Sequence, residues 1–263
     1  MNTTLKIVKY EMHDVARSRW LLAYALFFLV TTDTLLRFSD SGAKALLSLM
    51  NVVLFIIPLV GAVFGTTYLY NAREFTELLL AQPVNRKQMY AGLYLGLAVP
   101  LALGFLAGVG IPFAVHGLGD PAQRGALATL AATGAALTFV FVALAAAIAV
   151  RFEDKMKGLG AAIGLWLAFA VLYDGLVLLA ATMLADYPLE RPMLGLMLAN
   201  PVDLARVVLL LEFDVSALMG YTGAVFERFF GSAAGTLLAT LTLLLWVIIP
   251  AWLGLRAFQR KDF

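Results

Sequence analysis

The sequence predicts an all-α polytopic membrane protein with six membrane-crossing helices. Of its 263 residues, 62% are hydrophobic and 14% are charged, and the mean hydropathy is +0.89. A soluble domain has about half apolar and a quarter charged residues, so the apolar excess must face lipid. The apolar residues also gather into six runs, each near the roughly 20 residues that a helix needs to cross a bilayer core. We therefore expect a single transmembrane domain over 1–263.

The six expected spans are separated by short polar connections that concentrate the charged residues. Since the net charge is only +2, it does not indicate a nucleic-acid partner. The chain has no cysteine, which excludes disulfides and thiolate metal sites. The spans are expected at 20–36, 46–70, 89–115, 126–150, 158–185 and 234–255.

The distribution of Lys and Arg predicts the orientation. With the N-terminus inside, 13 of the 19 Lys and Arg residues fall on the cytoplasmic side and six on the outer side. Cytoplasmic loops carry the excess of these residues in membrane proteins. We expect a multi-pass protein of the bacterial inner membrane with both termini in the cytoplasm.

The first 19 residues predict an amphipathic helix before span 1. In "LKIVKYEMHDVARS", residues 5–18, the apolar side chains of Leu5, Val8, Met12 and Val15 share one stripe. Such a helix lies at the membrane interface. It is either a plain surface anchor or a collar that supports a partner protein.

The segment 186–233 tests the span count, because part of it is apolar enough for a seventh span. Asn200, Pro201, Asp203 and Arg206 would then lie in the middle of the membrane, where charges cost several kcal/mol. Two short re-entrant helices on the outer side fit better. Asn at the N-cap, Pro at the first position and Asp at the third predict that the second of them starts at Asn200-Pro201.

A short cytoplasmic helix is expected within 71–88, "NAREFTELLLAQPVNRKQ", between spans 2 and 3. Asn71 and Glu74 have the spacing of a capping box, and Arg73 can pair with Glu77. Pro83 should end the helix.

This short helix carries a small apolar patch, Phe75, Leu78 and Leu79, at helical spacing. The patch either rests on lipid headgroups or fills a groove in a soluble partner, since an apolar anchor ringed by polar residues is typical of such contacts. Arg86 marks the return into span 3.

The stretch E-F-T-E-L-L-L-A-Q-P-V-N-R, from Glu74 to Arg86, resembles the segment after the second span of ABC-2 type transporter permeases. The lead "IVKYEMHDVARSRWLL" and the six spans are also similar to this family. The resemblance implies that the segment is a coupling helix that docks on an ATPase. Its contact residues would be Glu74, Phe75, Glu77, Leu78, Leu79 and Arg86.

Two further stretches resemble one branch of the family, the membrane subunits of transporters that mature nitrous oxide reductase. They are "RFEDKMKGLGAAIGLWLAFAVLYDGLVLLAA" and "LANPVDLARVVLL". The resemblance implies a homodimer with two cytoplasmic ABC ATPase subunits, which hold ATP and Mg, and a periplasmic accessory protein as a further partner.

We expect no cofactor, metal or catalytic site in this chain. The sequence has no phosphate-binding G-x-x-x-x-G-K-[ST] loop and no H-E-x-x-H or G-x-S-x-G motif. His13 and His116 fall on opposite sides of the membrane in the expected topology. Met193 and Met197 near the outer face, with His116 on the same side, suggest a copper-binding alternative, although methionine more often fills packing gaps in apolar helices.

Asp174 is the clearest ionisable residue inside an expected span, toward its outer third. Intramembrane acids are candidates for a pathway or gate, and we group Asp174 with Asn200, Asp203 and Arg206 as a possible pathway or outer gate. The alternative is that Asp174 only reaches the outer interface or pairs with an outer arginine such as Arg206.

The sequence therefore leaves two functions open. The first is a permease that couples ATP hydrolysis in a partner to the export or handover of a cargo, in the context of copper-site maturation of nitrous oxide reductase. The second is a membrane scaffold that transports nothing and transmits ATPase strokes to a periplasmic protein.

Overall fold

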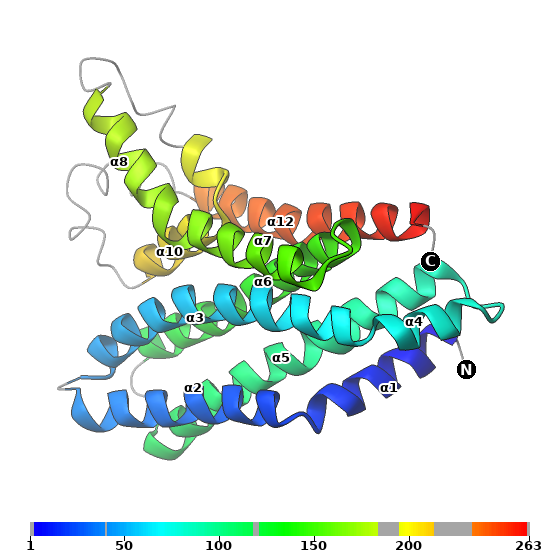
Figure 1. Ribbon diagram of the computed structural model, residues 1–263. Helices are drawn as coiled ribbons and strands as arrows, with labels where there is room; N and C mark the ends of the chain where they lie inside the picture. Colours follow the sequence, from blue (N-terminus) through cyan, green and yellow to red (C-terminus); the bar gives the residue numbers. More distant parts are fainter. Residues whose placement is uncertain (1–2, 40, 118–120, 184–194, 213–232, 262–263) are drawn as a thin grey trace.

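The computed structural model describes residues 3–39, 41–117, 121–183, 195–212 and 233–261. The described part is helical, with short connections and no strand (Figure 1). Its elements are α1 (Thr3–Ala16), α2 (Arg19–Phe38), α3 (Gly42–Asn71), α4 (Arg73–Leu80), α5 (Arg86–His116), α6 (Pro121–Arg151), α7 (Lys155–Leu167), the π-helical turn η1 (Ala168–Leu172), α8 (Tyr173–Met183), α10 (Pro201–Glu212) and α12 (Ala233–Arg260).

Six stretches of helix are long and apolar enough to cross a membrane, as predicted. They are Arg19–Phe38, Gly42–Asn71, Arg86–His116, Gln123–Arg151, Lys155–Ala180 and Leu237–Arg260. Several extend beyond the apolar runs; α5, with 31 residues, is about 46 Å long at 1.5 Å per residue. Within the doubtful segment 186–233, the structure describes α10, whose 12 residues are too few for a span. The rest of the proposed re-entrant arrangement, 186–194 and 213–232, lies outside the described residues.

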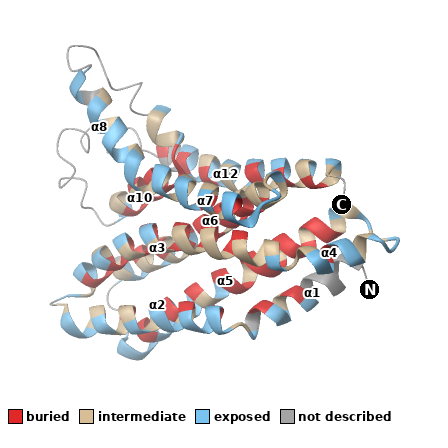
Figure 2. Cartoon of the chain, viewed as in Figure 1, coloured by how far each residue is buried: buried red, intermediate tan, exposed pale blue. Residues whose placement is uncertain are grey.

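The long helices run side by side, and both termini lie at the same end of the bundle as α4 (Figure 1). We name this the α4 end. Burial is uneven among the spans. In the most apolar stretch of α3 and of α5, half of the residues are buried. In the corresponding stretch of Lys155–Ala180, only 6% are buried. Figure 2 shows this contrast between α5 and the exposed α7 and α8.

Glycines allow two pairs of spans to approach very closely. A Cβ atom on Gly61 of α3 would lie 2.8 Å from the Cβ of Phe141 in α6. A Cβ on Gly108 of α5 would lie 2.7 Å from the carbonyl oxygen of Ala25 in α2. Within the α2–α5 pair, Phe28 packs edge-on against Phe105 with ring centroids 5.1 Å apart. Close approach at small residues is the usual way in which membrane helices associate.

The N-terminal helix packs against α5, which the amphipathic pattern did not predict. Val15 is fully buried, in agreement with its place on the apolar stripe, but Glu11 is also buried, with 2% of its surface exposed. The side chain of Glu11 packs directly against Gly96 of α5, and its carboxylate accepts a hydrogen bond from Tyr68. Burial raises the pKa of the Glu11 carboxyl. The structure leaves the side chains of Leu5 and Val8 undescribed, so half of the predicted stripe stays untested.

Replacing Gly108 should destabilise the fold through the α2–α5 contact. We expect Gly108→Val to lower the free energy of unfolding by about 1–3 kcal/mol, the usual cost of overpacking, as measured by thermal unfolding in detergent. Gly110→Val is the matched control, because a Cβ at Gly110 meets nothing within 4 Å. Equal effects of the two substitutions would show that the contact is not tight.

Candidate functional site: the α4 surface and the α8–α10 polar network

The expected short helix exists as α4, which follows α3 after a single residue. Thr76 is its buried side chain and donates a hydrogen bond to the carbonyl of Ala72. The helix ends at Leu80, three residues before Pro83. Asn85 then caps α5 by accepting a hydrogen bond from the backbone N–H of Lys87 at 3.0 Å. Helix α4 is therefore connected to α3 by one residue and to α5 by the five residues 81–85.

The predicted capping box of α4 is wrong, whereas the predicted ion pair is present. Asn71 is the last residue of α3, and Ala72, in helical conformation, occupies the N-cap position without a side-chain bond. The α3 helix continues one residue past the expected end of the span at residue 70, which makes Asn71 part of α3 and removes it from the cap. Its side chain instead accepts a hydrogen bond from Lys155 at 2.9 Å. Arg73 pairs with Glu77 at 2.9 Å.

The three apolar residues of the expected patch point in different directions. Leu78 is 70% exposed. Phe75 is 37% exposed and stacks on Tyr10 of α1 at 5.4 Å, which joins α4 to the N-terminal helix. Leu79 packs against the hydrophobic core of the bundle. The free outward face of α4 is therefore made by Leu78 and part of Phe75, beside the exposed Glu74 and Glu77.

Side-chain hydrogen bonds to backbone carbonyls tie the α3–α4 junction to the turn between α6 and α7. Tyr70 donates to the carbonyl of Phe152 at 2.7 Å, and Arg73 donates to that of Glu153 at 3.2 Å. Sequence reasoning missed these contacts. The only local signal was that both segments are polar and lie at the same side in the expected topology.

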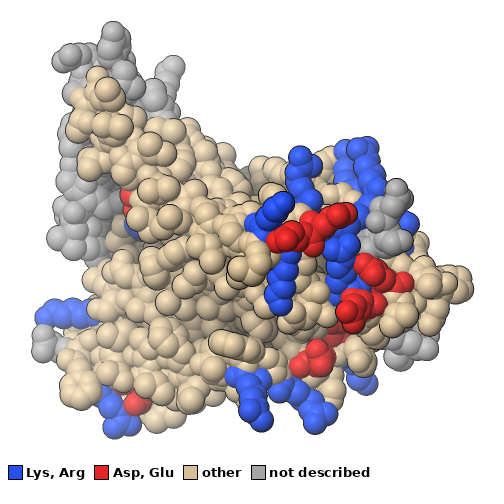
Figure 3. All heavy atoms as spheres, viewed as in Figure 1, with Lys and Arg blue, Asp and Glu red and all other residues tan. Residues whose placement is uncertain are grey.

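Arg86, expected at the docking surface, binds the C-terminal end of the chain. Its guanidinium donates to the carbonyls of Gln259 and Lys261 at 2.9 and 2.8 Å. Lys261 in turn donates to the carbonyl of Val150 at 3.1 Å. Figure 3 shows acidic and basic side chains gathered at the α4 end on the face in view.

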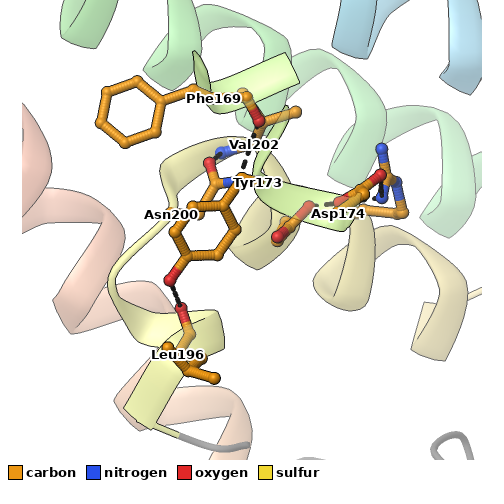
Figure 4. Close-up of polar contacts among 8 residues, drawn as sticks. Phe169, Tyr173, Asp174, Leu196, Asn200 and Val202 are labelled. Atoms are coloured by element: carbon orange, nitrogen blue, oxygen red, sulfur yellow. Dashed lines mark hydrogen bonds and ion pairs between the residues drawn. The ribbon is translucent and has the colours of Figure 1, made fainter. Parts of the chain in front are cut away.

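A second cluster lies where the fifth span meets α10 (Figure 4). The predicted helix start at Asn200-Pro201 is confirmed: the Asn200 side chain accepts a hydrogen bond from the N–H of Val202 at 2.9 Å. The same side chain donates to the carbonyl of Phe169 at 2.9 Å. Phe169 belongs to η1, and π-helical turns displace the backbone hydrogen bonds of a helix. Asn200 thus binds span 5 at its irregular turn.

Charged residues complete the same junction. Arg206 donates to Asp174 at 2.8 Å and to Asp203 at 3.2 Å. The alternative that Asp174 pairs with Arg206 is therefore confirmed, and a role of the cluster as a pathway or gate stays a prediction. Asp203 is only 7% exposed. Burial, and then the neighbouring Asp174, raise its pKa to about 7.

The structure thus brings together Asp174, Asn200, Asp203 and Arg206, which sequence reasoning had grouped. Two more contacts strengthen the junction: Tyr173 donates to the carbonyl of Leu196 at 2.6 Å, and Trp246 of α12 donates to that of Leu198 at 3.0 Å. These partners are backbone atoms, which carry no signature in the sequence.

The residues weighed for copper binding are not assembled into a site in the described part of the chain. His116 pairs with Asp33 at 2.7 Å, and Asp33 also pairs with Arg37. Met197 packs in a small hydrophobic cluster between α10 and α12. Met193 lies outside the described residues. No group of three or more His, Cys, Asp or Glu side chains that could hold a metal occurs among the residues that the structure describes.

The raised pKa of Asp203 predicts a pH-dependent stability. The native state retains a proton that the unfolded chain, with an aspartate pKa near 3.8, releases. The stabilisation is complete below pH 4 and is lost as the pH rises through 7. We expect the midpoint of thermal unfolding to fall between pH 4 and 7, and Asp203→Asn to remove a large part of that slope; the buried Glu11 carboxyl, whose pKa is also raised, contributes to the remainder. Glu74→Gln, which removes an exposed carboxylate, should keep the slope; an unchanged slope in Asp203→Asn would contradict the assignment.

Comparison with known proteins identifies the family. The sequence model of the family described as ABC-2 family transporter protein matches residues 5–263. The chain is 30% identical to the probable ABC transporter permease protein NosY of Pseudomonas aeruginosa, over 94% of this chain and 92% of that protein. It is 29% identical to the protein of the same name from Stutzerimonas stutzeri, over 97% and 95%. The chain therefore belongs to the ABC-2 family of transporter proteins and is a membrane permease.

Proposed function

We propose that this chain is the membrane subunit of an ABC transporter and that a separate cytoplasmic ATPase drives it through α4. The observation that carries the proposal is the match to two permeases over nearly the whole of both chains. The exposed face of α4, with Leu78 at its centre, supplies a docking point. ATP and Mg belong to the partner, and this chain carries out no catalysis itself.

The contacts of α4 support a path for force from the ATPase into the bundle. A push on α4 acts on α3 and on the α6–α7 turn through Tyr70 and Arg73. It acts on α1 through the stacking of Phe75 on Tyr10. The bonds of Arg86 couple α5 to the end of α12. Displacement of one short helix would therefore move several spans together, as in domain rotations that open and close a site.

The α8–α10 network is proposed as the outer element that responds. It contains hydrogen bonds and one arginine shared by two carboxylates, which can exchange for water when the junction opens. The side chains of Asp174 and Arg206 remain 45% and 31% exposed in the single chain. A second copy of the chain would shield these charges from lipid, which favours a homodimer that meets near the fifth span, with one ATPase on each copy.

We further propose a bacterial inner-membrane location with both termini in the cytoplasm. A periplasmic accessory protein would receive either the cargo or the conformational change that the ATPase drives. The similarity to the NosY proteins favours a role in copper-site maturation of nitrous oxide reductase. A scaffold that only transmits strokes is the second candidate. Cargo release into the outer compartment that depends on ATP hydrolysis distinguishes the permease from the scaffold.

Leu78→Asp should separate the permease from its ATPase. A carboxylate at the most exposed apolar position of α4 would have to be desolvated on docking, so we expect at least a tenfold loss of ATPase in co-purification, about 1.4 kcal/mol of binding. Phe75→Asp should act in the same direction, although it also removes the stacking on Tyr10.

Phe38→Asp is the matched control for Leu78→Asp. Phe38 is 83% exposed and ends α2 at the opposite end of the bundle. This variant should keep the ATPase at wild-type stoichiometry. Retention of the ATPase by Leu78→Asp, with normal membrane insertion, would place the contact elsewhere.

The orientation can be tested in this cysteine-free chain. A cysteine that replaces Ser41 should react with a membrane-impermeant maleimide added to intact cells, because it lies at the end opposite α4. Cysteines that replace Gln82 or Gln259 should react only after permeabilisation. Reaction at position 259 from outside would mean an odd number of spans and would contradict the topology.

A further inference from the structure

A large lateral groove between α2 and α3 has no role in the function proposed above. It has a volume of about 880 Å³ and lies at the level of the spans. Tyr24 and Phe27 of α2 form one wall, Val60 and Val63 of α3 form the other, and the buried Leu101 of α5 lies behind them. The walls are apolar along most of the length of the groove.

The groove is a consequence of how the spans pair. Gly104 and Gly108 hold α2 against α5, while Gly61 and Gly65 hold α3 against α6. Each of the two helices is thus drawn toward a different partner, and they diverge, as Figure 1 shows. A groove this large cannot stay empty in a membrane, because its walls would lose their van der Waals partners.

One end of the groove is polar. Asp14, Arg17 and Ser18, at the junction of α1 and α2, face Thr67 and Asn71 of α3 there. The opposite charges of Asp14 and Arg17 lie one helical turn apart. Neither forms an ion pair in the part of the chain that the structure describes. Among the described residues, Asp14 receives only a long hydrogen bond, 3.4 Å, from Tyr68. Both groups are available to a ligand.

The length of the groove matches one leaflet of a bilayer. Asn71 at the polar end and Ile56 near the apolar end are separated by 15 residues of α3, about 22 Å at 1.5 Å per residue. Half of a hydrocarbon core is roughly 15 Å thick, which leaves several ångströms for a headgroup. Trp20, which lines the groove next to the polar end, is a residue type enriched at that depth.

We propose that the groove binds one phospholipid with a zwitterionic amine headgroup, phosphatidylethanolamine. Arg17 binds the phosphate, Asp14 binds the ammonium, and an acyl chain lies between Val60 and Phe27. An anionic headgroup such as that of phosphatidylglycerol would bring its charge to Arg17 but leave Asp14 unpaired. The site does not depend on the transport function proposed above.

Native mass spectrometry of the protein from nanodiscs with equal phosphatidylethanolamine and phosphatidylglycerol tests the site. We expect one retained phosphatidylethanolamine per chain, with at least a fivefold preference over phosphatidylglycerol. Ala23→Phe places a bulky ring in the groove and should reduce the retained lipid about tenfold. Arg17→Gln should weaken retention of both lipids, and Asp14→Asn should remove the preference while lipid is still retained.

Two matched controls separate the groove from the general surface. Arg19→Gln removes a neighbouring charge that does not line the groove, and Ala132→Phe enlarges an exposed alanine on α6. Both should retain lipid as the wild type does. Equal retention in Ala23→Phe and Ala132→Phe, or no preference between headgroups in the wild type, would overturn the proposal. Disulfide-linked dimers formed by Ala23→Cys would overturn it as well, by showing that a second copy fills the groove.

Discussion

The close approach of helices at glycine residues is the constraint on which the rest of this structure depends. In a membrane no hydrophobic force draws one apolar helix to another, so contact area at short range decides which helices pair. Gly96 receives α1, Gly104 and Gly108 receive α2, and Gly61 and Gly65 place α3 on α6. These contacts put Glu11 against α5, and they separate α2 from α3 along the lateral groove.

The two ends of the bundle are held together differently. At the α4 end, side chains from α3, α4, α5 and the C-terminal residues donate to backbone carbonyls of distant segments, so the helix ends form one connected body. At the other junction, Asn200 and Arg206 bind an irregular turn and a shared pair of carboxylates. In the proposed function, the first of these regions is the one that receives the load from the ATPase, and the second is the polar junction that opens.

The candidate site could be predicted from the sequence where the signal was local. Asn200, Pro201 and Asp203 follow the rules for a helix start, and the start is found there. The patch on α4 was only half right, because helical spacing says which residues share a face but not what that face meets: Leu79 meets the core, and Phe75 meets Tyr10. The bonds of Arg86 to Gln259 and Lys261 could not be predicted, because they link residues that are far apart in the chain; a contact of Arg86 with the ATPase stays a prediction.

By itself the sequence determined the fold class, the six spans and the place of the short helix, because lipid requires about 20 apolar residues in a row and polar residues must lie outside them. Only the tertiary structure decided which spans pair, that Glu11 is buried, and that the fifth span is broken by a π-helical turn held by Asn200. These features depend on how well helix surfaces fit together and on hydrogen bonds to backbone carbonyls. Neither produces a recognisable pattern in the sequence.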